Sequence, residues 1–326
     1  MEGAALHRGQ RPEERCEDPL TEVRSFGDTL ARRVAERESQ IVLGLDPDPL
    51  DLWPGLAAAV GGSAEHAVAG AVREQCLALL TAAGPACVAV KLQLARFEVL
   101  GAEGRELLAE LVAAAREQGL LVIADGKRGD IDVTAAAYAA ALFDGMQTPF
   151  GPLQGLRADL ATVNPLMGLD AVEPFVAAAR RTGAGVLLLV RTSNPGARDV
   201  EDLPMADGRP LWERLAGIVD RLGAEGRGTS GLSDVGAVIG ASQPGHLPRA
   251  RELMPAAPFL LPGVGAQGGE VSLLAAAFEP GRAGGLVSAS RSIAGAFREL
   301  GGEPAGAARA AAESLREQAW TLSERC

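Results

Sequence analysis

Eight short apolar runs, separated by longer amphipathic stretches, constrain the fold of this 326-residue chain more than any other feature. The runs are continuous rather than alternating, which is typical of parallel strands buried on both faces. They lie at residues 41–47, 87–93, 120–127, 160–165, 185–193, 235–242, 259–265 and 285–291. Helical patterns lie at 21–37, 65–82, 103–117, 170–181, 209–223, 269–277 and 303–322. Eight strands, each followed by a helix, predict a closed α/β barrel of the (β/α)8 (TIM barrel) class.

A doubly wound open sheet is the alternative architecture. No GxGxxG fingerprint follows the first run, and no second domain is visible, so the barrel is favoured. We expect residues 21–326 to form one barrel domain and residues 1–20 to be a disordered extension. The segments 143–157 and 194–208 are rich in Pro, Gly and Asp. We expect both to be loops, and the second to be a candidate lid.

Composition excludes several classes of protein. A net charge of −11 argues against non-specific nucleic-acid binding, and 47% hydrophobic residues exclude disorder of the bulk. The N-terminus is polar and lacks an apolar h-region, and no run approaches 18 apolar residues, so we expect neither a signal peptide nor a membrane span. Four scattered cysteines without a CxxC pair argue against a metal cluster or a disulfide framework. We therefore expect a cytoplasmic protein that has neither nucleic-acid nor membrane partners.

The two lysines are the most informative residues. The chain has 31 Lys and Arg residues, and only Lys91 and Lys127 are lysine. An ammonium can release a proton at an accessible pKa and acts as a compact point charge, whereas a guanidinium does neither well. Each lysine lies near the carboxyl end of an apolar run, where barrel enzymes build their sites. We infer that both occupy positions where arginine fails.

Carboxylates accompany these lysines. Asp46, Asp125 and Asp130 lie at or just after the ends of the first and third runs, and Asp125 is two residues from Lys127, on the same face of a strand. Alternating carboxylates and ammoniums hold one another ionised and make a fixed field without metal or cofactor. Such a field suits the stabilisation and protonation of a carbanion. A solvated salt bridge is the alternative for any one of these residues.

A second candidate site binds an anion. The glycine-rich segment 262–269 follows the seventh run and leads into a predicted helix, and Ser290 and Arg291 follow the eighth run. The loops after strands seven and eight are the usual phosphate site of barrel enzymes. Ser193 is a further candidate for a substrate hydrogen bond, although no histidine is available to make it a nucleophile. Asn164 is interpreted either as a pocket residue or as a turn amide.

Six segments together resemble orotidine 5′-phosphate decarboxylase, in its longer bacterial subgroup, over about residues 25–300. They are GLDPDP (44–49), VKLQLARFE (90–98), DGKRGDIDVTAAAYA (125–139), RTSNPGA (191–197), LPGVGAQGG (261–269) and SASRSI (288–293). The segment TVNPLMGLDAVEPF (162–175) indicates the subgroup. The resemblance rests mainly on the D-x-K-x-x-D-I-x-x-T pattern with an upstream lysine at a strand end.

The resemblance implies a (β/α)8 barrel that converts orotidine 5′-monophosphate to UMP and CO2 without metal or cofactor, the last step of de novo pyrimidine synthesis. It implies that Lys91, Asp125, Lys127 and Asp130 form a charged tetrad with Lys127 as the proton donor. It also implies a homodimer in which Asp130 and Thr134 reach the neighbour's site. The implied substrate-binding residues are Asp46, Ile131, Thr134, Ser193, Pro262, Gln267, Ser290 and Arg291.

Three rivals stay open at this point. A related phosphosugar decarboxylase, such as 3-keto-L-gulonate 6-phosphate decarboxylase, uses magnesium and typically has a carboxylate at the position of Lys91. A Schiff-base aldolase would use a strand-end lysine as its nucleophile. A non-catalytic barrel that binds a phosphorylated metabolite would keep the phosphate site alone.

Overall fold

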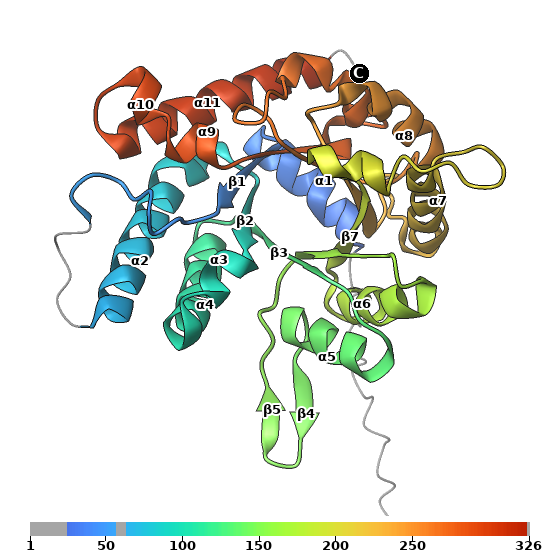
Figure 1. Cartoon of the computed structure of the whole chain (residues 1–326), viewed down its shortest axis with the longest axis horizontal. Coiled ribbons are helices and arrows are strands. Elements are labelled where there is room, and N and C mark those ends of the chain that lie inside the picture. The colour runs from blue at the N-terminus through green and yellow to red at the C-terminus, as the bar shows by residue number, and fades with distance from the viewer. Residues whose placement is uncertain (1–24, 57–62, 325–326) are drawn as a thin grey trace, which may run out of the picture.

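The computed structural model describes residues 25–56 and 63–324, and its eight parallel strands close into a barrel (Figure 1). The strands are β1 (Ile41–Leu45), β2 (Ala89–Gln93), β3 (Leu121–Arg128), β6 (Leu160–Val163), β7 (Gly185–Arg191), β8 (Val235–Ile239), β9 (Phe259–Pro262) and β10 (Gly285–Ala289). Each predicted run contains one strand, and the strands pair around the ring in the order β1-β10-β9-β8-β7-β6-β3-β2. The predicted barrel is confirmed.

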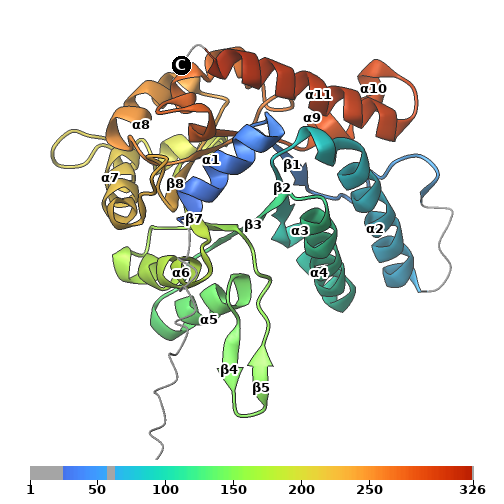
Figure 2. The same ribbon diagram turned by 180° about the vertical axis from the view of Figure 1, so that it is seen from behind.

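Helices surround the ring of strands (Figure 1). They are α1 (Phe26–Arg37), α2 (Ala64–Ala83), α3 (Leu94–Glu98), α4 (Gly101–Glu117), α5 (Asp132–Leu142), α6 (Leu169–Thr182), α7 (Leu211–Gly223), α8 (Leu247–Leu253), α9 (Arg291–Ala294), α10 (Phe297–Leu300) and α11 (Pro304–Ser323). Helix α1 precedes the first strand and crosses one end of the ring, in front of the strands in Figure 2. No helix of the described residues is long and apolar enough to cross a membrane.

The inside of the barrel is layered because strand side chains alternate between two faces. A lower, apolar layer packs on Phe26, Leu30 and Val34 of α1. Its strand members include Val42, Ala89, Ile123, Leu160, Leu187, Leu260 and Leu286. The residues two positions further along five of these strands form an upper, mostly polar layer at the carboxyl end: Lys91, Asp125, Thr162, Pro262 and Ser288. The same alternation thus fills one end of the barrel with apolar side chains and places polar side chains at the other end.

The predicted helix over 269–277 is wrong. This segment forms two 3-10 turns, η6 (Val271–Leu273) and η7 (Ala275–Phe278). Arg251 of α8 donates from Nη2 to the carbonyl oxygen of Ala277 at 2.8 Å and from Nε to that of Ala276 at 3.4 Å. The carbonyls at the end of this segment are therefore bonded by a buried guanidinium.

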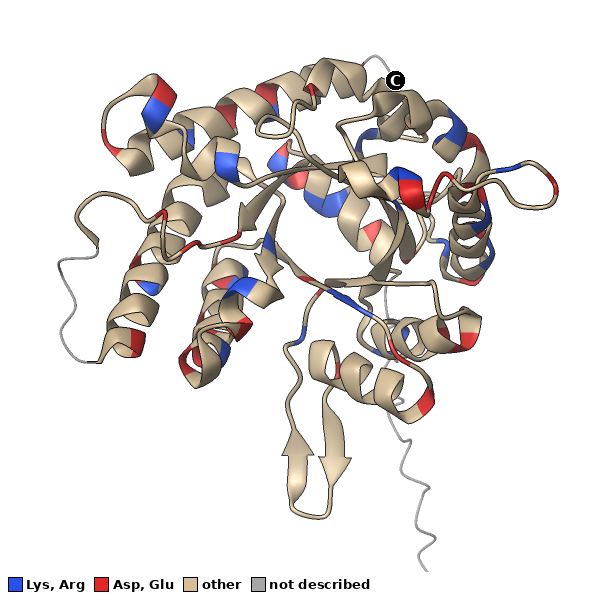
Figure 3. Cartoon of the chain, viewed as in Figure 1, with Lys and Arg blue, Asp and Glu red and all other residues tan. Residues whose placement is uncertain are grey.

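The segment 143–157 contains a hairpin instead of the predicted loop. Its strands β4 (Met146–Thr148) and β5 (Gly151–Leu153) pair antiparallel and project away from the barrel (Figures 1 and 2). Neither strand contains a charged residue (Figure 3). The expectation of a disordered extension at 1–20 lies outside the described residues.

Candidate active site

A cavity of about 530 Å³ opens at the carboxyl ends of the barrel strands. Its walls come from all eight strands or the loops that follow them; β1 contributes through Asp46 and β8 through Val238. Nine of the predicted site residues line it: Asp46, Lys91, Asp125, Lys127, Ser193, Pro262, Gln267, Ser290 and Arg291. Residues from distant parts of the sequence therefore meet in one cavity.

Asp125 lies between both lysines of the chain. Its Oδ2 is 2.9 Å from Lys91 Nζ, and its Oδ1 accepts a hydrogen bond from Lys127 Nζ at 2.7 Å. Lys91 Nζ also donates to Asp46 Oδ1 at 3.1 Å. The four groups form a chain of alternating charge, Asp46–Lys91–Asp125–Lys127, in which each ammonium contacts at least one carboxylate.

The backbone of β3 turns Lys127 toward Asp125. Lys127 has a φ of +47°, and the pairing of β3 with β6 shifts register between Ala124 and Arg128. Thr162 on β6 holds this irregular end: its hydroxyl donates to Asp125 Oδ1 at 2.8 Å and accepts from Lys127 N at 2.9 Å. A strained backbone at a functional position is stable only when its surroundings fix it, and Thr162 is part of that support.

The two ammonium groups differ in how deeply they are buried. The Lys91 side chain is 6% exposed, and that of Lys127 is 43% exposed. Burial alone would lower the pKa of Lys91, but Asp46 and Asp125 outweigh it, so the pKa of Lys91 is raised. Burial alone would raise the pKa of Asp125, yet the two lysines lower it to about 2. Both groups are therefore charged at neutral pH.

Sequence reasoning missed Thr162 and Gln93 as members of this site. With its amide nitrogen turned toward Asp125, Gln93 donates to Asp125 O and Oδ2, each at 2.8 Å. Gln93 lies two residues after Lys91 on β2, so strand alternation was the available signal for it. Asn164 satisfies both of its interpretations, because it lines the cavity and its Oδ1 accepts from Leu166 N at 3.0 Å.

The glycine-rich loop after β9 differs from the expected helix entry. Residues 263–269 form a compact turn in which Gly265 N donates to Gly269 O and Gly268 N donates to Gly265 O. No α-helix follows it, so the expectation that its amides open a helix N-terminus is wrong. Gln267 at its tip and Arg291 at the start of α9 are both exposed and line the same cavity. The guanidinium of Arg291 and the side-chain amide of Gln267 are therefore available there to bind an anionic group.

Asp130, Ile131 and Thr134 do not join the cavity of their own chain. They lie at the start of α5, where Ile131 is 55% exposed and Thr134 is also exposed. The residue-based expectation that Asp130 shares one pocket with the other four charges is therefore wrong within one chain. Across the described ranges, no group of three or more His, Cys, Asp or Glu side chains is arranged to hold a metal ion.

Comparisons with known proteins agree with this geometry. Residues 39–310 match the sequence model of the family described as "Orotidine 5'-phosphate decarboxylase / HUMPS family". The orotidine 5′-phosphate decarboxylase of Deinococcus radiodurans is 41% identical, covering 90% of this chain and 96% of that protein. Its counterpart in Rhodopirellula baltica is 37% identical, covering 82% and 88%. The structure of Leishmania donovani OMP decarboxylase aligns with a TM-score of 0.68 at 30% identity, covering 92% of this chain and 99% of that one.

Proposed function

The chain belongs to the orotidine 5′-phosphate decarboxylase / HUMPS family, and from that premise we propose how its cavity performs the reaction. It is a decarboxylase of the pyrimidine pathway, and its reaction converts orotidine 5′-monophosphate to UMP and CO2. The observation that carries the mechanism is Asp125 held between two ammoniums on the wall of the cavity.

We propose that Lys127 is the proton donor. The bond between C6 of the pyrimidine and its carboxylate breaks, CO2 leaves, and the electron pair stays on C6. The Lys127 ammonium stabilises that developing carbanion and then transfers a proton to C6, which leaves a neutral amine. A preorganised charge aimed at the forming anion contributes several kcal/mol in such sites. Of the two lysines, Lys127 is the more exposed to the cavity, and Lys91 is locked between two carboxylates.

The other cavity residues each bind a different part of the nucleotide. Asp46 and Lys91 bind the ribose hydroxyls, and Ser193 contacts the pyrimidine. Gln267 and Arg291 bind the phosphate, with Pro262 and Ser290 completing that end. Support comes from the placement of all seven on one cavity whose two ends differ: carboxylate–ammonium pairs on β1 to β3, and a glycine-rich turn with an arginine after β9 and β10.

We propose that the active unit is a homodimer with shared sites. Asp130, Ile131 and Thr134 lie outside their own cavity, on the exposed start of α5. Around them Val133, Leu166 and Met167 are also exposed, at 75%, 56% and 47%. An exposed apolar surface of this kind is typical of a protein interface. A second copy seated there would cover it and bring Asp130 and Thr134 to the neighbour's cavity.

The test is the loss of orotidine 5′-monophosphate absorbance with purified protein in excess EDTA. We expect turnover that EDTA does not reduce, because the charged chain needs no metal to stabilise a carbanion. Absence of turnover from folded protein that still binds UMP would contradict the proposal and favour a binding barrel. Turnover that EDTA abolishes would favour the magnesium-dependent phosphosugar chemistry, which the ammonium at position 91 argues against.

A further inference from the structure

Arg191 is a buried cation that lies beside the cavity without lining it. The pairing of β7 with β8 shifts register between Leu189 and Arg191, so that two residues of β7 face one of β8. Such a bulge re-aims a side chain. Leu189, Thr192 and Ser193 line the cavity, whereas the Arg191 side chain, 3% exposed, points into the loop that follows β7.

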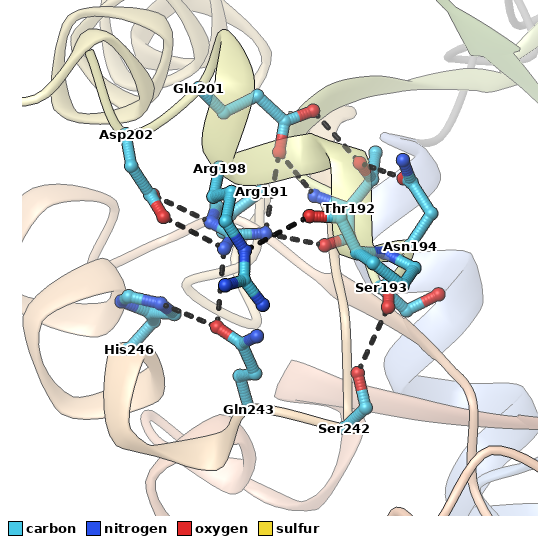
Figure 4. A network of polar contacts seen from close by, with 11 residues as sticks. Arg191, Thr192, Ser193, Asn194, Arg198, Glu201, Asp202, Ser242, Gln243 and His246 are labelled. Atoms are coloured by element: carbon cyan, nitrogen blue, oxygen red, sulfur yellow. Dashed lines mark hydrogen bonds and ion pairs between the residues drawn. The ribbon is translucent and has the colours of Figure 1, made fainter.

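Arg191 fastens both ends of that loop (Figure 4). Its Nε and Nη2 donate to Asp202 Oδ1 and Oδ2 at 2.8 and 3.0 Å, and its Nη1 donates to Thr192 O at 2.7 Å. Glu201 adds a second connection: its carboxylate accepts from Thr192 N at 2.8 Å and from Thr192 Oγ1 at 2.9 Å. Residues 192 and 202 are thereby held together, and the chain between them forms a closed loop.

This loop is one wall of the cavity. Ser193, Asn194, Gly196, Ala197, Val200 and Glu201 all line it. On its other side the loop is tied to the segment that follows β8, where Ser242 Oγ donates to Ser193 O at 3.2 Å and Arg191 Nη2 donates to Gln243 Oε1 at 3.1 Å. A Cβ at Gly240, the first residue after β8, would lie 2.7 Å from Ser193 Cα, so Ser193 packs directly on the backbone there.

We propose that Arg191 is a positioning residue that presents the 192–202 wall, and Ser193 on it, to the pyrimidine ring. This inference rests on the proposed function, because that function supplies the pyrimidine base that Ser193 contacts. The planar fork of arginine reaches a carboxylate, a carbonyl and an amide at once, and lysine cannot reproduce that geometry. The part of the 194–208 segment that faces the cavity is then a fixed wall rather than a lid.

Arg191→Lys tests the proposal, and Arg180→Lys is its matched control. Arg180 likewise bonds one carboxylate twice (Asp234), a second acid (Glu225) and a carbonyl (Leu222), but Asp234 lies before β8, at the opposite end of the barrel. Each variant is measured for kcat, KM and thermal stability. Binding of UMP is compared with binding of ribose 5-phosphate, which lacks the base.

We expect Arg191→Lys to weaken UMP binding about tenfold, the effect of losing one hydrogen bond to the base, with ribose 5-phosphate binding unchanged. Arg180→Lys should leave both affinities unchanged even where it lowers the Tm equally. Adding Arg191→Lys to Ser193→Ala should have little further effect on UMP binding, since the first acts through the second. If Arg191→Lys does not fold, Asp202→Asn serves as the second variant. It weakens the same Arg191–Asp202 contact from the carboxylate side and should reproduce the loss of UMP affinity.

Equal effects of Arg191→Lys and Arg180→Lys on UMP affinity would overturn the inference, as would equal losses of UMP and ribose 5-phosphate binding. These outcomes are distinct from a failure of the proposed function. That failure appears as a parent protein that does not decarboxylate orotidine 5′-monophosphate, before any variant is compared.

Discussion

Lys127 illustrates how much of the chemistry depends on single positions. Its backbone adopts the left-handed region, its amide is bonded to Thr162, and its ammonium contacts Asp125. Arg191 and Arg251, in contrast, use the five donors of a guanidinium to bind several oxygens at once. The two residue types have separate tasks here: arginine fastens the backbone, and lysine supplies a compact charge with a proton.

Replacing Lys127 tests the proton-donor role. Lys127→Ala and Lys127→Arg should each lower kcat by at least about a thousandfold, because the second variant keeps the charge but not a transferable proton. UMP binding, measured by calorimetry, should stay within about tenfold of the parent, since phosphate and ribose contacts are untouched. Near-normal turnover of Lys127→Arg would show that Lys127 is not the proton donor.

The pH dependence of stability tests the field around Asp125. Its pKa of about 2 is below the ordinary aspartate value of 3.8, so its ionised form is favoured by folding. The resulting stabilisation, about 2 kcal/mol, is fully present above pH 3.8 and is lost as the pH falls toward 2. The free energy of unfolding in urea is measured for the parent and for Asp125→Asn. The difference between them, parent minus variant, should therefore fall by about 1 kcal/mol from pH 6 to pH 3. Glu313→Gln on the exposed face of α11 gives the baseline, and a difference constant with pH would contradict the assignment.

A buried arginine bonds the end of the segment that follows β9. Arg251 of α8 is buried over the ring of Phe259, 3.8 Å from its centroid, and its Nη1 donates to Met254 O and Ala257 O. Its Nη2 donates to Ala277 O and Gly284 O. Burial lowers the pKa of Arg251 to about 9, which leaves it charged at neutral pH. One guanidinium thus joins the segment after α8, the turn at 275–278 and the residue before β10.

Arg251→Met should lower the free energy of unfolding by about 3 kcal/mol or more, because several buried carbonyls lose their donor together. Arg249→Met, two residues earlier on α8, is the matched control: that arginine is 46% exposed and pairs with Glu213 and Glu252. It should change stability little. Denaturant titration measures both, and equal losses would show that Arg251 does no more than a surface ion pair.

In the whole molecule, as far as the structure describes it, the start of α5 and the uncharged β4–β5 hairpin expose apolar side chains away from the barrel core. Met146, Phe150 and Leu153 of the hairpin segment are 54%, 101% and 57% exposed. Hairpin and α5 are consecutive in the chain and project on the same side of the barrel in both ribbon views (Figures 1 and 2). The proposed second copy accounts for both.

Mixing two inactive variants tests the shared site. Asp130→Ala and Lys127→Ala subunits, after exchange, should recover about a quarter of parental activity, since half of the dimers are mixed and each carries one intact site. Exchange is followed with differently tagged subunits, and each variant alone provides the background. No recovery after complete exchange would exclude a contribution of Asp130 to the neighbouring site.

The order and spacing of residues along the chain predict the barrel and most of the charged chain. Continuous apolar runs specify buried parallel strands, and the polar residues that end them must meet at one edge, so Lys91, Asp125 and Lys127 were predictable from order and spacing. Other features depend on the tertiary structure. The pairing of β6 with β3 brings Thr162 to Asp125, and the bulge in β7 directs Arg191 away from the cavity. The segment 269–277 forms 3-10 turns, and Arg251 bonds its last carbonyls. The physical reason is that these outcomes depend on contacts between residues distant in sequence, which local propensity and periodicity do not encode.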